Sequence, residues 1–253
     1  MIGLSTTAFK GDDIEGWLED VEKLGFDYIE WVCEWPRFLD QNLFEKLKEL
    51  MSSFNLPLTL HAPFSDLNVA SFNEIIRKAS MGAVEKALHR AVDLGAVAVT
   101  IHPGHCSPVS RKYPKEYLRI HRSSLEKIAR TAEELGVNVG VENMPRFPIL
   151  DAQTPERLKN IIDGIPIGVT FDVAHLNTTG ADFEGFITNF KDRVIVLHLH
   201  DNHGSEDEHL ALGEGNIPWE VLLPKLPKVP ATIEVKNLRD AEKSIALLKS
   251  LHW

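Results

Sequence analysis

Short apolar runs alternate with longer amphipathic segments along the whole chain. At three places an amphipathic segment closes on leucine followed by glycine, at Gly25, Gly95 and Gly136, and an apolar run follows at once. A glycine just past a helix adopts the left-handed conformation that ends it, and alternating Val and Ile then favour a strand. Counting outward from these points, we predict strands near residues 2–7, 27–32, 57–61, 97–101, 137–141, 167–171, 194–199 and 231–235.

The segments between the predicted strands carry a helical period. It is clearest over residues 73–94 and 114–135, where apolar residues recur on one stripe. Strand and helix alternate eight times at about 32 residues per unit, which is typical of a closed parallel barrel. The competing open, doubly wound sheet carries a glycine-rich fingerprint that this chain lacks. We therefore predict an α/β protein with a single (β/α)8 TIM-barrel domain over residues 1–253.

Composition narrows the class of protein. The chain has 43% hydrophobic and 25% charged residues, which is typical of a globular protein, and only two cysteines. It opens without a basic leader segment, and no apolar run approaches the roughly 18 residues that span a bilayer. We expect a soluble, cytoplasmic protein without a membrane partner, and nothing in the sequence identifies a protein partner. The net charge of −10 argues against strong nonspecific binding to nucleic acid, which needs a basic surface.

Nearly every predicted strand ends in a histidine, an aspartate or a glutamate. In a barrel of this kind the chemistry lies at the carboxyl ends of the strands, so these side chains would meet at one rim. One such residue alone is more often a helix cap or a structural group, but several carboxylates at one rim repel each other unless a cation lies between them. We therefore predict a divalent-metal site. Its candidate ligands are His61, His102, Glu142, Asp172, His175, His198, Asp207, His209 and Glu234.

The stretch 197–217 contains the densest motifs of the chain: His-Leu-x-Asp at 198–201, Asp-x-His at 207–209 and Leu-Gly-Glu-Gly-Asn-Ile at 212–217. With the residues at the other strand ends, it resembles the superfamily of xylose isomerase-like barrels that includes endonuclease IV and sugar isomerases. The resemblance runs from the second predicted strand to the eighth. It implies a xylose isomerase-like TIM barrel.

The resemblance also implies a grouping of the ligands around as many as three Zn²⁺ ions, with Mn²⁺ or another divalent ion as an alternative. His61 and His102 would hold the first ion, and Glu142 would bridge it to the second. The second ion would be completed by Asp172, His198 and Glu234, and the third would be held by His175, Asp207 and His209. Relatives commonly carry Asn or Lys at the place of His200. Since His200 shares strand parity with His198, we expect it to face the pocket and to act in an acid–base step.

Two reactions fit such a rim, and the sequence-based preference is phosphoester hydrolysis of the endonuclease IV kind. Clustered metal ions generate hydroxide and clamp a phosphate, either in abasic-site DNA or in a small phosphorylated substrate. The presence of all nine ligand types favours this reaction. Four basic residues that follow strand ends would contact the substrate phosphates, namely Arg37, Arg111, Lys112 and Arg146.

The alternative is a metal-dependent sugar or sugar-phosphate isomerase or epimerase. One ion on Glu142, Asp172, His198 and Glu234 would polarise a carbonyl, and Glu142 and Glu234 would serve as acid and base. The segment 200–235 favours a small substrate, because it holds seven acidic residues against two lysines. A metal-binding protein that has lost catalysis is a third reading. Outside the rim, His89 and His121 lie in predicted helices, where we expect both to face solvent.

Overall fold

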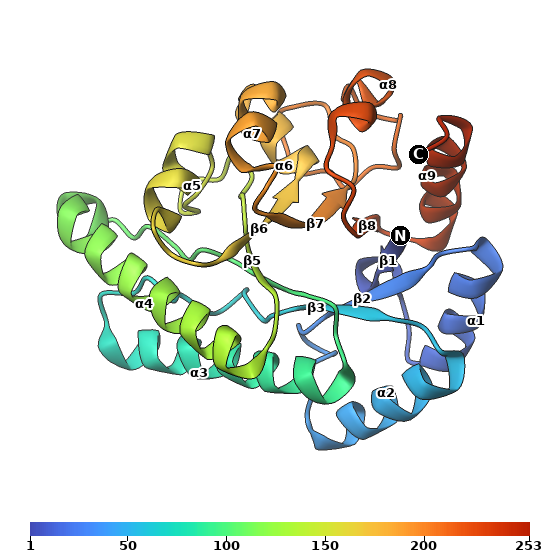
Figure 1. Cartoon of the computed structure of the whole chain (residues 1–253), viewed down its shortest axis with the longest axis horizontal. Coiled ribbons are helices and arrows are strands. Elements are labelled where there is room, and N and C mark those ends of the chain that lie inside the picture. The colour runs from blue at the N-terminus through green and yellow to red at the C-terminus, as the bar shows by residue number, and fades with distance from the viewer.

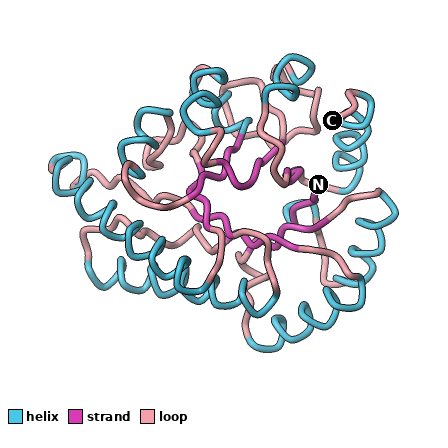
Figure 2. The backbone as a smooth tube through the Cα atoms, in the orientation of Figure 1, coloured by secondary structure: helices cyan, strands magenta, loops and turns pink.

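Eight parallel strands run around a closed barrel, and each pairs with the strands before and after it in the chain. The computed structural model describes residues 1–253. The pairing of Leu4 with Ile233 closes the ring between the first and the last strand. In Figure 2 the strands form the inner ring and the helices surround it. The strands are β1 (Ile2–Ser5), β2 (Tyr28–Val32), β3 (Leu58–His61), β4 (Val99–Ile101), β5 (Val139–Glu142), β6 (Gly168–Asp172), β7 (Val194–Leu199) and β8 (Ala231–Ile233).

Helices connect successive strands and pack on the outside of the barrel (Figure 1). They are α1 (Ile14–Leu24), α2 (Gln41–Phe54), α3 (Glu74–Leu94), α4 (Pro114–Leu135), α5 (Pro155–Ile162), α6 (Val173–Thr179), α7 (Phe183–Phe190), α8 (Trp219–Leu222) and α9 (Leu238–Ser250). Short 3₁₀ turns are η1 (Thr6–Ala8), η2 (Ser110–Lys112) and η3 (Leu223–Lys225). The predicted closed parallel α/β barrel is confirmed, and each strand overlaps its predicted apolar run.

The predicted helix ends are confirmed at the glycines. Gly25, Gly95 and Gly136 have φ angles of 81°, 64° and 68°, in the left-handed region, directly after α1, α3 and α4. This conformation is favourable for glycine, and in each case the glycine N–H bonds back to the last turn of the helix. The chain therefore turns sharply from each of these helices into the next strand.

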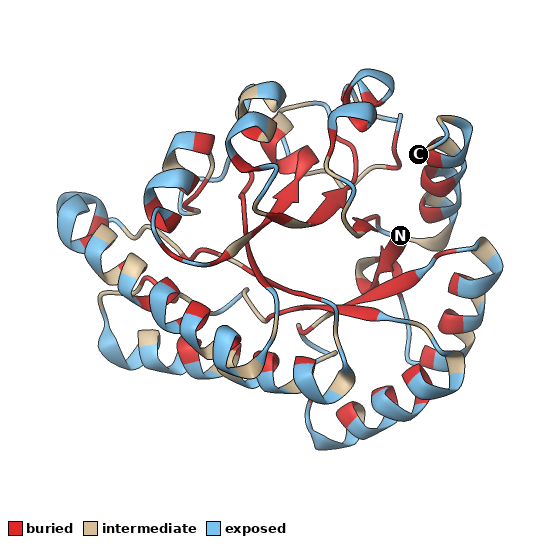
Figure 3. Ribbon diagram, in the orientation of Figure 1, coloured by how far each residue is buried: buried red, intermediate tan, exposed pale blue.

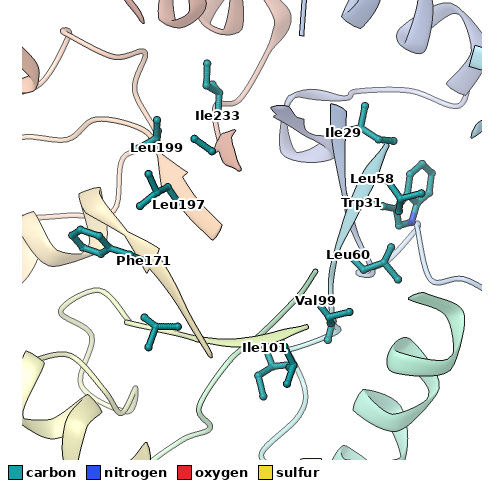
Figure 4. Packing of buried hydrophobic residues seen from close by; sticks show 14 of the residues in the cluster. Ile29, Trp31, Leu58, Leu60, Val99, Ile101, Phe171, Leu197, Leu199 and Ile233 are labelled. Carbon is teal, nitrogen blue, oxygen red and sulfur yellow. The ribbon is translucent and has the colours of Figure 1, made fainter. Parts of the chain in front are cut away.

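Residues along each strand alternate between two environments. Those that point away from the barrel axis are apolar and pack against the helices, as Figure 4 shows for Ile29, Trp31, Leu58, Leu60, Val99, Ile101, Phe171, Leu197, Leu199 and Ile233. Their neighbours point inward and are largely polar. Tyr28 and Thr232 share a hydrogen bond of 2.9 Å there, and Thr100 and Thr170 one of 3.0 Å. The buried residues thus form the barrel wall and the inner helix faces (Figure 3).

One helical prediction is wrong. His89 on α3 is exposed, as expected, but His121 on α4 is fully buried. His121 lies four residues after the buried Tyr117 and four before the buried Leu125, so it belongs to the stripe of α4 that faces the barrel. None of the helices combines the length and the apolar character that a membrane crossing requires.

Candidate metal centre

The barrel carries its histidines and carboxylates at the carboxyl ends of six strands. His61, Glu142 and Asp172 are the last residues of β3, β5 and β6, while His102 and Glu234 directly follow β4 and β8. His198 lies in β7, His175 in the first turn of α6, and Asp207 and His209 in the loop between β7 and α8. Parallel strands bring all of their carboxyl ends to one rim, so these residues lie together.

Their donor atoms fall into three groups, within each of which all atoms lie within 4.8 Å of one another. We call these the first cluster (His61, His102, Glu142), the second cluster (Glu142, Asp172, His198, Glu234) and the third cluster (His175, His200, Asp207, His209). This is the grouping that the resemblance implies, with His200 added to the third cluster. Glu142 belongs to both the first and the second cluster.

Glu142 directs its two oxygens at different clusters. Oε2 lies 3.2 Å from His61 Nε2 and 3.1 Å from His102 Nε2, whereas Oε1 lies 2.9 Å from His198 Nδ1. Burial opposes ionisation of this side chain, but the surrounding imidazoles hold its pKa well below the usual value. Glu142 is therefore an ionised carboxylate at the junction of two clusters, as a bridging ligand requires.

Three of the histidines are oriented by backbone carbonyls. Nδ1 lies 2.9 Å from the Ala62 oxygen in His61, 2.9 Å from the Asn143 oxygen in His175 and 3.0 Å from the Glu234 oxygen in His209. A carbonyl only accepts, so Nδ1 carries the hydrogen and the lone pair of Nε2 faces the cluster. Outer partners of this kind are typical of metal-binding histidines.

The second cluster is rich in buried carboxylates. Burial raises the pKa of Glu234 to about 8, and the carboxylates of Glu30 and Glu142 add to the rise while His198 opposes it. Asp172 caps α6, because its Oδ1 accepts from the His175 backbone N–H at 2.7 Å. Buried carboxylates in mutual contact need a compensating cation. Carboxylate oxygens and imidazole nitrogens are ligands of divalent metals, so the residues present fit such ions.

A cavity of about 760 Å³ opens above the clusters. Of the second cluster, only Glu142 and Glu234 line it, whereas Asp172 and His198 lie behind them with no exposed surface. Arg146 is the only lysine or arginine in the lining. The apolar part of the wall is formed by Val32, Phe64, Met144, Phe147, Ile149 and Leu150.

Of the four basic residues predicted to meet phosphates, the structure brings only Arg146 to this cavity. Arg37 instead lies 4.7 Å over the ring of Phe9 and donates to the Phe9 carbonyl oxygen. Arg111 donates to the carbonyl oxygen of Pro148 and lines a separate cavity. Lys112 is exposed at the end of η2, outside the lining. A strand-end position places the backbone of such a residue, but local contacts decide where its long side chain points.

His200 also differs from its predicted place. It is fully buried and does not line the cavity. Its Nε2 lies 3.2 Å from Asp172 Oδ2 and 3.6 Å from Asp207 Oδ1, and its ring stacks on that of His209 at 4.0 Å. His200 therefore contacts residues of the second and third clusters but has no access to a substrate in the cavity.

Two residues of the site were missed. His105 lines the cavity, and Glu30 in the middle of β2 lies 2.9 Å from His198. Glu30 lies inside a strand and not at its carboxyl end, where barrel chemistry is expected. An isolated charge inside a strand of otherwise apolar residues was the available signal, because glutamate is rarely buried without a partner.

Comparison with known proteins agrees with this architecture. A protein family described as xylose isomerase-like TIM barrel matches residues 18–251. An uncharacterized protein of Methanocaldococcus jannaschii is 38% identical, over 98% of this chain and 87% of that protein. The crystal structure of a D-tagatose 3-epimerase-like protein superposes with a TM-score of 0.92 at 35% identity, covering 99% of this chain and 96% of that one.

Similarity to a DNA-repair enzyme is weaker. A probable endonuclease 4 of Enterococcus faecalis is 29% identical, over 79% of this chain and 76% of that enzyme. Both kinds of relative therefore share the barrel with this chain, and the epimerase-like protein covers more of it at higher identity. With the family match extending from α1 to α9, the chain belongs to the xylose isomerase-like TIM barrel family.

Proposed function

We propose that this protein is a divalent-metal-dependent isomerase or epimerase of a sugar or sugar phosphate, in which Glu142 and Glu234 move the proton next to a carbonyl. The observation that carries the proposal is that these two carboxyl groups alone, of the second cluster, line the cavity. They are the groups that a substrate there would meet. The likeness to a D-tagatose 3-epimerase-like protein supports the same chemistry. The proposal ranks isomerisation or epimerisation above phosphoester hydrolysis, which is the reverse of the ranking from the sequence.

The metal and the two carboxyl groups have separate tasks. Glu142, Asp172, His198 and Glu234 would hold an ion, which would supply Lewis-acid polarisation of the substrate carbonyl and the adjacent hydroxyl. One carboxylate then takes the proton from the carbon beside the carbonyl, and the C–H electron pair moves into the adjacent C–C bond and towards the carbonyl oxygen. In an epimerase the other carboxyl group returns a proton to the opposite face of that carbon, and the carbonyl forms again. In an isomerase the proton goes to the former carbonyl carbon, while the hydroxyl on the neighbouring carbon becomes the new carbonyl and its proton passes to the former carbonyl oxygen.

The environments of the two carboxyl groups suit this division of roles. Burial raises the pKa of Glu234 to about 8, whereas the imidazoles around Glu142 overcome its burial and hold its pKa well below the usual value. In the absence of metal the pair therefore holds one carboxylate and one carboxylic acid, and an ion in the second cluster would displace the proton of Glu234. The two carboxyl groups thus differ in proton affinity, as is usual for acid–base catalysis by a carboxyl pair.

The lining of the cavity bears on the substrate class. Arg146 is its only lysine or arginine, and no ion pair joins the Arg146 side chain to a carboxylate. A guanidinium without a partner at the edge of an otherwise acidic cavity suits a phosphate group. The apolar wall beside it suits the C–H faces of a sugar chain. We therefore favour a phosphorylated ketose over a free sugar.

Phosphoester hydrolysis remains the second candidate, and a specific observation favours it. The first and third clusters place further donor atoms beside the second. Proton transfer beside a carbonyl needs one ion, so it does not account for these donors. A multinuclear centre would use them to bind a phosphate and to activate water.

Deuterium exchange tests the proposal directly. The metal-loaded protein is incubated in deuterated water with D-tagatose and with ketose phosphates, and loss of the proton beside the carbonyl is followed by NMR. We expect metal-dependent exchange that falls by about 10²- to 10⁴-fold in Glu234→Gln. Glu133→Gln, on the exposed part of α4, is the matched control and should retain full exchange. Absence of exchange with every ketose and ketose phosphate would overturn the proposal.

A further inference from the structure

One buried carboxylate inside the barrel has no part in the proposed reaction. Glu30 lies in the middle of β2 with no exposed surface, and it does not line the cavity. One of its oxygens, Oε1, has no hydrogen-bond partner. A buried and half-satisfied carboxylate destabilises a fold unless something compensates for it. Its position therefore calls for an explanation beyond packing.

The compensating contact is with a residue of the second cluster. Glu30 Oε2 lies 2.9 Å from His198 Nε2. The other nitrogen of the same ring, Nδ1, lies 2.9 Å from Glu142 Oε1 and 3.6 Å from Glu234 Oε1. The imidazole thus stands between Glu30 on one side and the catalytic carboxyl pair on the other, and both His198 and Glu30 are fully buried.

This geometry gives the two ring nitrogens different roles. Nδ1 faces the carboxylates of the second cluster, whereas Nε2 faces Glu30, which is not a member of that cluster. With an ion in the second cluster, Nδ1 would be the ligand and Nε2 would keep its hydrogen and donate it to Glu30. For His61, His175 and His209 the hydrogen-bond partner of Nδ1 is a neutral backbone carbonyl. For His198 the partner behind the ring is a carboxylate.

We infer that Glu30 is a positioning residue, which holds His198 with Nδ1 directed at the metal of the second cluster and strengthens that nitrogen as a ligand. The inference rests on the proposed function in one respect, because both require a metal in the second cluster. A carboxylate behind a metal-bound histidine fixes the ring and raises its basicity, and loss of such a partner typically weakens metal binding about 10- to 100-fold.

Two substitutions separate the contributions of charge and hydrogen bond. Glu30→Gln keeps the size but removes the charge, and its amide can donate to Nε2 and so turn the lone pair away from the cluster. Glu30→Leu removes the hydrogen bond altogether. Asp151→Asn is the matched control, because Asp151 is also a buried carboxylate beside a buried histidine, 3.3 Å from His121 Nδ1, and does not belong to any of the three clusters.

The experiment measures Zn²⁺ affinity by competition with a chromophoric chelator, and thermal unfolding of the chelated proteins. We expect both Glu30 variants to bind the ion of the second cluster about 10- to 100-fold more weakly. Without metal they should unfold at a lower temperature than the wild type, because His198 loses a buried partner, but remain folded at the temperature of the affinity measurement. Asp151→Asn should also unfold at a lower temperature, because His121 and Arg157 lose a partner, but should keep wild-type affinity.

Further outcomes separate this inference from the proposed function. The ion that the wild type binds and Asp172→Asn does not is the ion of the second cluster, because Asp172 belongs to that cluster alone. Wild-type affinity in both Glu30 variants, or a loss explained by their unfolding, would overturn the role of Glu30 and leave the proposed function standing. If Asp172→Asn binds as many ions as the wild type, no ion occupies the second cluster, and both the role of Glu30 and the proposed function are overturned. Nitrogen NMR of the zinc-loaded protein adds a readout that is independent of affinity: His198 should carry its hydrogen on Nε2, and a hydrogen on Nδ1 would contradict the inference.

Discussion

The second and third clusters lie side by side at the rim but are built differently. Glu142, Asp172 and His198 of the second cluster lie on barrel strands, Glu234 directly follows β8, and all four are buried. The third cluster consists mainly of histidines, and two of its members, Asp207 and His209, lie on a loop with side chains 28% and 24% exposed. One cluster is carboxylate-rich and anchored in strands. The other is histidine-rich and partly carried by a loop.

This difference assigns the proposed reaction to the second cluster and the ordering of a loop to the third. Strands hold the carboxyl pair of the second cluster in fixed positions, as proton transfer demands. The third cluster joins α6 to the loop after β7, because His175 Nε2 and His209 Nε2 each lie 3.3 Å from Asp207 Oδ2. An ion there would order the loop that walls the cavity. Changes in the second cluster should therefore reduce turnover, and changes in the third should act on loop order and substrate binding.

The largest effect is expected from Glu142→Ala compared with His209→Ala. Glu142 faces both the first and the second cluster, so its loss should remove more metal and reduce proton exchange by about 10³-fold. His209 belongs to the third cluster alone, and its loss should cost about tenfold or less. Metal content by mass spectrometry and exchange rate by NMR check both variants. Equal metal content and equal exchange would abolish the distinction between the two clusters.

His200 is one of the residues that connect the second and third clusters, and its substitution should give an intermediate effect. His200→Leu removes the hydrogen bond to Asp172 and the stacking on His209, so we expect exchange to fall about 10- to 100-fold. His200→Gln provides the control, since its amide reaches the position of Nε2, retains a donor for Asp172 and should keep most of the activity. If both variants exchange at the wild-type rate, His200 does not couple the two sites.

How far the sequence predicted this centre can be judged residue by residue. Strand ends such as His61 and Glu142 could be placed because parallel barrel strands deliver them to one rim whatever the rest of the chain does. Arg37 could not, since a long side chain follows its local partners, here Phe9. The burial of His121 could be predicted only by knowing which residues of α4 face the barrel. Glu30 depended on a contact with His198 across 168 residues of sequence, which no local pattern reveals.

Substitution of Arg146 tests whether the third cluster's side of the cavity serves substrate binding. Its backbone N–H donates to Thr178 Oγ1 of α6, the helix that carries His175, so it belongs to the third cluster's side of the cavity. Arg146→Met should raise KM for a ketose phosphate about tenfold and leave kcat nearly unchanged, because one charge-assisted contact is lost. The free ketose serves as the control and should show no change in KM. A loss confined to kcat would place Arg146 in the chemistry instead.

The smallest effect concerns the stability of the chelated protein. The pKa of Glu234 is raised to about 8 from its usual 4.5, and that of His209 to about 9 from 6.5. Burial drives the rise in Glu234, while Asp207 outweighs burial in His209. Between the usual and the raised pKa the folded state keeps a proton that the unfolded chain has released, so stability falls from about pH 4.5 to 8 through Glu234 and from about pH 6.5 to 9 through His209. We expect the unfolding temperature to drop by several degrees between pH 6.5 and 9.5.

Two variants divide that pH dependence between the clusters. Glu234→Gln should remove the part of the decline that ends near pH 8, and His209→Asn the part that ends near pH 9. Loading with metal should reverse the trend, because the ion competes with protons for the same atoms and binds more tightly as pH rises. A chelated protein whose unfolding temperature is constant over this range would contradict the assignment of raised pKa values to these two groups.

The most direct test of the central claim sets the two reactions against each other in one preparation. Metal-loaded protein is assayed for deuterium exchange beside the carbonyl of ketose phosphates, and for nicking of a DNA duplex that contains one abasic site. The account predicts metal-dependent exchange, lost in Glu234→Gln, and no nicking above that of the metal-free protein. Nicking that requires metal and weakens steeply with salt, without any proton exchange, would contradict it and make the centre a phosphoesterase.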